Sequence, residues 1–96
     1  MLSSMVMPHT QREKGKLVAR VRRIGGQLRA VEKALEEEQD CSSVMQLIAS
    51  CRGALNGLMS EVIEGHMSEH VAEEKHAGKR KMAADELLEV LKTYLR

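Results

Sequence analysis

Two histidines four positions apart, His66 and His70, close the stretch EVIEGHMSEH and have the clearest chemical potential in this sequence. On a 3.6-residue period both share a helix face with Val62, so they are expected to point toward the core. An imidazole pair at this spacing can bind a transition metal ion, or it can complement the negative end of a helix dipole. The zinc-protease motif H-E-x-x-H is excluded because Met67 follows the first histidine. The pair predicts half of a metal site whose other ligands lie elsewhere.

The composition around these histidines predicts an all-α protein. The chain has 96 residues, with no Trp or Phe and one Tyr, and its apolar residues are almost all Leu, Val, Ile, Met and Ala. One small domain of this length buries a limited core, which favours oligomers. No apolar run approaches the ~20 residues of a membrane span and no signal peptide is evident. We therefore expect a cytoplasmic protein with reduced cysteines and no membrane contact.

Three helices are expected to position the histidines. The expected elements are a flexible arm over residues 1–10 and a single helical domain over 11–96, with helices over 11–39, 41–72 and 81–95, a turn at EQDC and a polar linker EEKHAGKRK. The turn folds the second helix back along the first, which makes a long antiparallel hairpin followed by a short C-terminal helix.

Apolar residues in steps of three and four predict how the hairpin packs. The first helix carries a seam of Leu17, Val21, Ile24, Leu28, Val31 and Leu35, and the second carries Val44, Ile48, Cys51, Leu55, Leu58 and Val62. Further apolar residues widen the apolar surface of the second helix beyond one seam. This helix is therefore expected to pack on the first helix and on another subunit. Gly53 and Gly57 are expected to let a neighbouring backbone approach closely.

The missing metal ligands can be sought from helix geometry. Cys41 and His66 are separated by nearly 40 Å along one helix, at about 1.5 Å per residue, so they cannot share an ion within a chain. If the second helix pairs antiparallel with its symmetry mate, Cys41 of one subunit lies beside His66 and His70 of the other. His9 in the arm lies at the same end. The set His9, Cys41, His66 and His70 follows, although each also has an ordinary structural role; Cys51 is expected to be a buried apolar residue.

Basic residues on the first helix supply a second clue. Residues 11–31 contain seven Lys or Arg against one acid. Lys16, Arg20, Arg23 and Gln27 are expected to share one face opposite the apolar seam, flanked by Arg22, and to contact the phosphates of double-stranded DNA. Stacking on single-stranded bases is not available without aromatic residues. The alternative is a solvated charged face.

Several segments together resemble a known family. LVARVRRIGGQLRAVEKAL, the following DC, IASCRGALNGLMSEVIEGH and LLEVLKTYL resemble the copper-sensitive operon repressors, a family with nickel/cobalt-responsive and formaldehyde-responsive branches. The resemblance covers about residues 7–96. It implies dimers of four-helix-bundle type built on the second helix, disc-like homotetramers, operator binding through basic residues of the first helix, and release of DNA when an effector binds. Independently of the resemblance, no nucleophile, base and orienting group assemble in the sequence motifs, so the chain is not expected to be an enzyme.

The resemblance also implies roles for particular residues. Cys41 matches the family's sensing cysteine, His66 its helix-two histidine and His9 its arm ligand, whereas His70 stands where copper sensors have a cysteine. This pattern resembles the nickel/cobalt branch, and one thiolate among nitrogen donors suits Ni(II) or Co(II), with Zn(II) as an alternative. Where that branch has a further histidine this chain has Glu73.

Other residues leave the ligand set and the effector open. Glu69 could contribute an oxygen ligand. If the chain begins after Met7, the amine of Pro8 is free, and the formaldehyde-responsive branch joins such an amine to the cysteine, here Cys41, through a methylene bridge. If Met1 is the start, that amine is absent. The sequence therefore predicts a metal-responsive repressor, with a formaldehyde-responsive repressor and a plain helical interaction module as alternatives.

Overall fold

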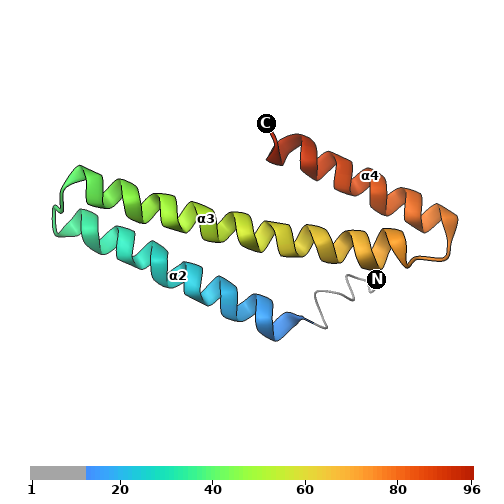
Figure 1. The fold of residues 1–96 in the computed structure, drawn as a ribbon, viewed down its shortest axis with the longest axis horizontal. Coiled ribbons are helices and arrows are strands. Elements are labelled where there is room, and N and C mark those ends of the chain that lie inside the picture. Colours follow the sequence, from blue (N-terminus) through green and yellow to red (C-terminus); the bar gives the residue numbers. More distant parts are fainter. Residues whose placement is uncertain (1–12) are drawn as a thin grey trace. The chain divides into compact units, whose positions relative to one another are not determined.

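The computed structural model describes residues 13–96, and every regular element in this range is a helix (Figure 1). The elements are α2 (Lys14–Glu36), α3 (Cys41–His66), the π-helical segment η1 (Met67–Ala72) and α4 (Ala77–Tyr94). The predicted all-α fold of three helices is confirmed. The chain forms two compact units, Lys14–Ser60 and Glu61–Arg96. Across the described residues, no helix combines the length and apolar character needed to cross a bilayer.

A tight turn ends α2 and begins the hairpin of the first unit. The amide of Gln39 donates to the carbonyl of Ala34 (3.0 Å), and the amide of Glu38 donates to that of Leu35 (3.1 Å). These two bonds form a Schellman motif, which requires a left-handed residue at its centre. Glu38 fills that position with φ 56°. The turn therefore accepts backbone strain at a place where glycine is usual.

Asp40 caps the first turn of α3. Its carboxylate accepts hydrogen bonds from the amide of Ser43 (3.1 Å) and from the Ser43 hydroxyl (2.7 Å). The Ser43 side-chain bond is the main cause that lowers the pKa of Asp40 below its usual value. An aspartate at this position satisfies one of the amide groups that a helix start leaves unpaired. Cys41 is thereby fixed as the first residue of α3.

The hairpin buries only part of the strip that the sequence predicts on α2. Ile24 and Ala34 are buried, whereas Val21, Leu28 and Leu35 are 51%, 54% and 60% exposed. The predicted seam is therefore only partly a contact with α3. Because Val21, Leu28 and Leu35 recur every seven residues, they form one exposed flank along α2.

On α3 the burial follows the prediction more closely. Val44 and Cys51 are buried, and Cys51 is the small buried apolar residue expected. Ile48 and Leu55 of the same predicted seam remain 49% and 48% exposed. One chain therefore leaves apolar surface on α3, as expected of a helix that packs on more than one neighbour.

The second unit begins where α3 changes its winding. The predicted helix over 41–72 is continuous to Ala72, but its last six residues form η1. The amide of Glu73 donates to the carbonyl of Ser68 at 2.9 Å, the five-residue step of a π-helix. Such segments are rare and frequently mark functional sites. His70 lies inside this one.

Helix α4 begins at Ala77, four residues earlier than predicted. His76 is its N-cap, because its Nδ1 accepts from the amide of Lys79 at 3.3 Å. The Arg80 guanidinium donates to the carbonyls of Glu74 (2.9 Å) and Lys75 (3.1 Å). These bonds convert the second half of the predicted linker into the first turn of a helix. Helix α4 then packs against η1 and buries Ala83.

Candidate metal and DNA-binding sites

The two histidines that the sequence singles out lie side by side. The ring centroids of His66 and His70 are 5.2 Å apart, and the rings are inclined at 50°. Both side chains are half-buried. His66 is the last residue of α3 and His70 belongs to η1, so the winding of η1 sets the direction of the second ring relative to the first.

A contact with α4 fixes the tautomer of His66. Its Nε2 lies 3.0 Å from the carbonyl oxygen of Ala83, in a partly buried position. A carbonyl only accepts, so Nε2 carries the proton and donates. Nδ1 is therefore the ring nitrogen through which a deprotonated His66 could bind a metal ion. Histidine ligands are commonly oriented by such a bond to a carbonyl.

The surroundings of His70 favour its neutral form. Burial is the main cause that lowers the pKa of His70, and the neighbouring His66 lowers it further, against raising effects of Glu74 and Glu86. Metal binding requires a deprotonated imidazole, so this shift makes His70 available as a ligand at lower pH. The Nε2 atom of His70 and the Oε1 atom of Glu69 are both buried.

The structure brings together only part of the predicted ligand set. Cys41 is exposed at the start of α3 and belongs to the other compact unit. His9 and Pro8 lie outside the described residues. Within residues 13–96 no three His, Cys, Asp or Glu side chains are grouped as a metal site. The donors that do meet are two imidazoles, which fit a nitrogen-rich site that requires further ligands.

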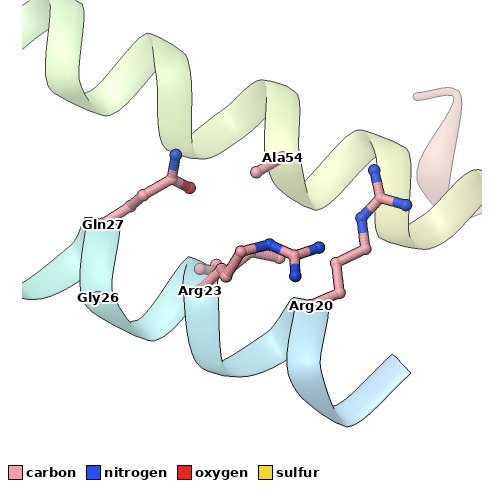
Figure 2. A pocket seen from close by; sticks show the side chains of 6 residues that line it. Arg20, Arg23, Gly26, Gln27 and Ala54 are labelled. Atoms are coloured by element: carbon pink, nitrogen blue, oxygen red, sulfur yellow. The ribbon is translucent and has the colours of Figure 1, made fainter. Parts of the chain in front are cut away.

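The basic residues of α2 occupy a different face from the one predicted. A groove of the hairpin unit is lined by Arg20, Arg23, Ile24, Gly26, Gln27 and Ala54. Figure 2 shows Arg20 and Gln27 reaching from α2 toward α3, whereas the Arg23 side chain extends along α2. Gln27 donates to the hydroxyl of Ser50 on α3 at 3.4 Å. The prediction that this face is opposite the apolar seam is wrong, because Arg20 and Gln27 lie four residues before and three after the buried Ile24 and share its side of the helix.

The remaining predicted DNA contacts and the two glycines can be placed as well. Lys16 and Arg22 are exposed on α2. A Cβ at Gly53 would meet nothing within 4 Å, and a Cβ at Gly57 would meet the guanidinium of Arg20. The expected close approach of a neighbouring backbone is therefore wrong within the hairpin. What Gly57 accommodates is a side chain.

Two interacting groups were missed in the sequence. The sequence predicts a linker at His76. In the structure, the extended backbone of His76 and its bond to the amide of Lys79, three positions later, are typical of an N-cap. The Ala83 carbonyl carries no sequence signal, since its role depends on how α4 docks. The four-residue spacing between Arg20 and Ile24 is the sequence signal that places both on the same side of the helix.

The structure thus combines an all-helical hairpin and a basic groove with a histidine pair that is a candidate metal site. Residues 13–93 match the family described as metal-sensitive transcriptional repressors. The transcriptional repressor RcnR of Salmonella paratyphi B is 46% identical over 90 residues, which cover 94% of this chain and all of that protein. An uncharacterised Serratia marcescens protein, from the region 5′ of bioA, is 48% identical over 91 residues, which cover 94% of this chain and all of that protein.

A solved structure is similar as well. It is a variant of the formaldehyde-responsive regulator FrmR from Salmonella enterica serovar Typhimurium, 42% identical, with a TM-score of 0.79 over 86% of this chain and 94% of that one. The chain belongs to the family of metal-sensitive transcriptional repressors. Its relatives are repressors and not enzymes, which confirms that expectation.

Proposed function

We propose that this repressor binds operator DNA in the absence of effector and releases it when Ni(II) or Co(II) binds a site shared between two subunits. The observation that carries the metal assignment is the histidine pair. His66 has its Nε2 committed to the Ala83 carbonyl, which leaves Nδ1 as a donor, and the lowered pKa of His70 keeps the second ring neutral. Two imidazoles 5.2 Å apart supply borderline nitrogen donors that suit these ions, with Zn(II) as an alternative.

The remaining ligands are proposed to come from a second subunit and from the arm. Cys41 begins α3 and His66 ends it, so a neighbouring α3 running antiparallel would place its Cys41 beside the histidine pair. His9 would close the site from the arm, and Glu69 is a further oxygen donor. When bound, the metal ion supplies coordination bonds that hold ligands of two subunits together. The exposed apolar surface of the isolated chain supports the homodimer and homotetramer that this arrangement needs.

DNA binding is assigned to the basic residues of α2. Lys16, Arg20, Arg22 and Arg23 place four cations on fewer than three helical turns, enough to neutralise several phosphates of duplex DNA. Release by an effector requires that the effector bind the free repressor more tightly than the DNA-bound one. A site that joins two subunits meets this condition when the spacing of the subunits in the free repressor fits the metal ion better than the spacing in the DNA-bound state.

A formaldehyde response is the second candidate, favoured by the likeness to the formaldehyde-responsive regulator FrmR and by the exposed thiol of Cys41. In this reaction the Pro8 amine and the Cys41 thiol would condense with formaldehyde to a methylene bridge, releasing one water molecule. It requires that Pro8 be the first residue of the mature chain. The His70 ring has no part in it.

An effector-release assay distinguishes the two candidates. Duplex DNA selected by the wild-type protein from a random-sequence pool is bound, and Ni(II), Co(II), Zn(II), Cu(I) and formaldehyde are added separately to protein whose N-terminus is verified by mass spectrometry. We expect release by Ni(II) or Co(II). His70→Glu should lower the affinity for Ni(II) and Co(II) more than tenfold, where each factor of ten corresponds to about 1.4 kcal/mol. Any formaldehyde response should be unchanged. Release by formaldehyde alone would contradict the metal assignment.

A further inference from the structure

Helix α4 begins with positively charged residues, which the helix dipole disfavours at this end. Lys79, Arg80 and Lys81 lie near its start, and its first turn contains no acid. Cations at the positive end of a helix dipole destabilise the helix unless another interaction offsets the cost. Lys81 forms such an interaction with Asp85 of the next turn, at 2.9 Å. Arg80 forms one of a different kind.

The Arg80 side chain joins α4 to the segment that follows η1. Its Nη1 donates to the carbonyl oxygen of Glu74 at 2.9 Å and to that of Lys75 at 3.1 Å. Carbonyls at the end of a helix lack partners within the helix, and basic side chains commonly bind them. The guanidinium is therefore placed beyond the carboxyl end of η1, where a positive charge is favourable, although its own residue belongs to the amino end of α4.

The same loop between η1 and α4 is fixed at two further places. The amide of His76 donates to the Glu74 carboxylate at 3.1 Å, and Nδ1 of His76 accepts from the Lys79 amide at 3.3 Å. Gly78 makes room for this imidazole, because a Cβ there would lie 3.1 Å from its Cε1 and 3.3 Å from its Nδ1. The loop therefore follows a defined path, which determines where α4 begins.

The docking of α4 decides which atom faces His66. Ala83 lies three residues after Arg80, close to one helical turn, and is buried where α4 packs against η1. The Ala83 carbonyl oxygen lies 3.0 Å from Nε2 of His66. We propose that Arg80 is a positioning residue for His66: its bonds to the loop carbonyls hold the start of α4 against η1, which presents the Ala83 carbonyl to the imidazole.

The consequence of this role for metal binding rests on the proposed function. An imidazole that donates from one ring nitrogen to a carbonyl has its other nitrogen directed as a ligand, and removal of such an outer partner commonly lowers metal affinity about ten- to a hundredfold. Without the docked carbonyl, the neutral His66 ring is free to carry its proton on Nδ1 instead. The effect on the tautomer is therefore measurable in metal-free protein.

The test compares three variants of the full chain. Arg80→Met keeps an unbranched side chain and a high helix propensity but removes both bonds to the loop. Arg80→Lys is the conservative variant, because both bonds come from one nitrogen atom and an ammonium group has three donors. Lys92→Gly is the control, because it removes one positive charge and destabilises the last turn of α4 while the start of the helix is unchanged. Circular dichroism and thermal melting verify that each variant is folded.

Two readouts are used. Nitrogen-15 NMR of the imidazole rings, at a pH at which imidazole is neutral, gives the tautomer of His66 in metal-free protein. Titration calorimetry gives the Ni(II) affinity. We expect His66 to carry its proton on Nε2 in the wild type and in Lys92→Gly. Arg80→Met should show a mixture of both tautomers and an Ni(II) affinity about tenfold lower, and Arg80→Lys should recover at least part of both losses.

Three results would overturn the positioning role. The first is an unchanged His66 tautomer in folded Arg80→Met. The second is an equal change in Lys92→Gly, because the effect would then come from the general stability of α4. The third is no recovery by Arg80→Lys, because donation to the loop carbonyls would then not be the cause. A wild type that binds neither Ni(II), Co(II) nor Zn(II), although its His66 tautomer depends on Arg80, would instead refute the proposed function and leave the positioning role in place.

Discussion

At the scale of single residues, the central feature is the different chemical state of two neighbouring imidazoles. His66 is tied to the Ala83 carbonyl through Nε2, whereas burial and the nearby His66 lower the pKa of His70. The first residue has a defined tautomer and the second resists protonation. Together they offer two nitrogen donors without a rearrangement of the ring that contacts α4.

The lowered pKa of His70 predicts how stability depends on pH. The unfolded chain takes up a proton at His70 near the usual pKa of 6.5, and the folded chain does so only at lower pH. The unfolded state therefore binds more protons between the two values, and the free energy of unfolding falls as pH falls through this window. The stability that the lowered pKa of His70 contributes is fully present above pH 6.5. Metal-free protein is unfolded with denaturant at pH 7.5 and 5.5, at one protein concentration. The free energy of unfolding should fall more between these two pH values for the wild type than for His70→Gln. An equal loss in both proteins would contradict the shift.

At the scale of the elements, the turn between α2 and α3 carries a local strain that can be removed. Glu38 adopts φ 56° at the centre of a Schellman motif, a conformation that costs a non-glycine residue about 1–2 kcal/mol. Glycine avoids this cost but loses about 0.5–1 kcal/mol through its larger unfolded-state freedom.

Glu38→Gly is therefore expected to stabilise the hairpin. The free energy of unfolding should rise by about 0.5–1 kcal/mol, measured by thermal or urea unfolding, because the avoided strain exceeds the added entropy. Glu37→Gly is the matched control. It changes the same residue type one position earlier, where φ is not positive, and should lower stability. If Glu38→Gly also destabilises the protein, the left-handed turn is not a source of strain.

The elements also show what the sequence can and cannot predict. The helical spans of α2 and α3 follow from apolar periodicity, and His66 and His70 were paired from their four-residue spacing alone. The start of α4 was missed because an imidazole caps it, and the face of Arg20 was misplaced because its charge was weighed above its spacing to Ile24. The bond from His66 to Ala83 joins residues 17 positions apart. Only the packing of α4 on η1 creates it, so no local pattern predicts it.

At the scale of the whole molecule, the isolated chain is an incomplete unit. Its buried apolar residues within 13–96 are Ile24, Ala34, Val44, Cys51 and Ala83. Larger apolar side chains, among them Leu28, Leu35 and Met45, are more than half exposed. A small helical chain with this distribution can enlarge its core by association with copies of itself, as proposed above. The same association is what the proposed metal site requires.

The measurement that tests the shared site most directly is complementation between two inactive variants. Cys41→Ala and His70→Ala, carrying different tags, are coexpressed and the mixed dimers are purified by both tags. His70 is chosen over His66 because its removal leaves the bond between His66 and the Ala83 carbonyl in place. Cys51→Ala, which changes the buried cysteine, is the control and should keep full metal binding.

Ni(II) binding by titration calorimetry, with release of the selected duplex DNA, gives the readout. The account predicts no high-affinity site in either parent variant and one intact site per mixed dimer, because one chain supplies Cys41 and the other supplies His70. Mixed dimers that are folded, bind DNA and bind no Ni(II) would contradict it, since the ligands would then come from a single chain.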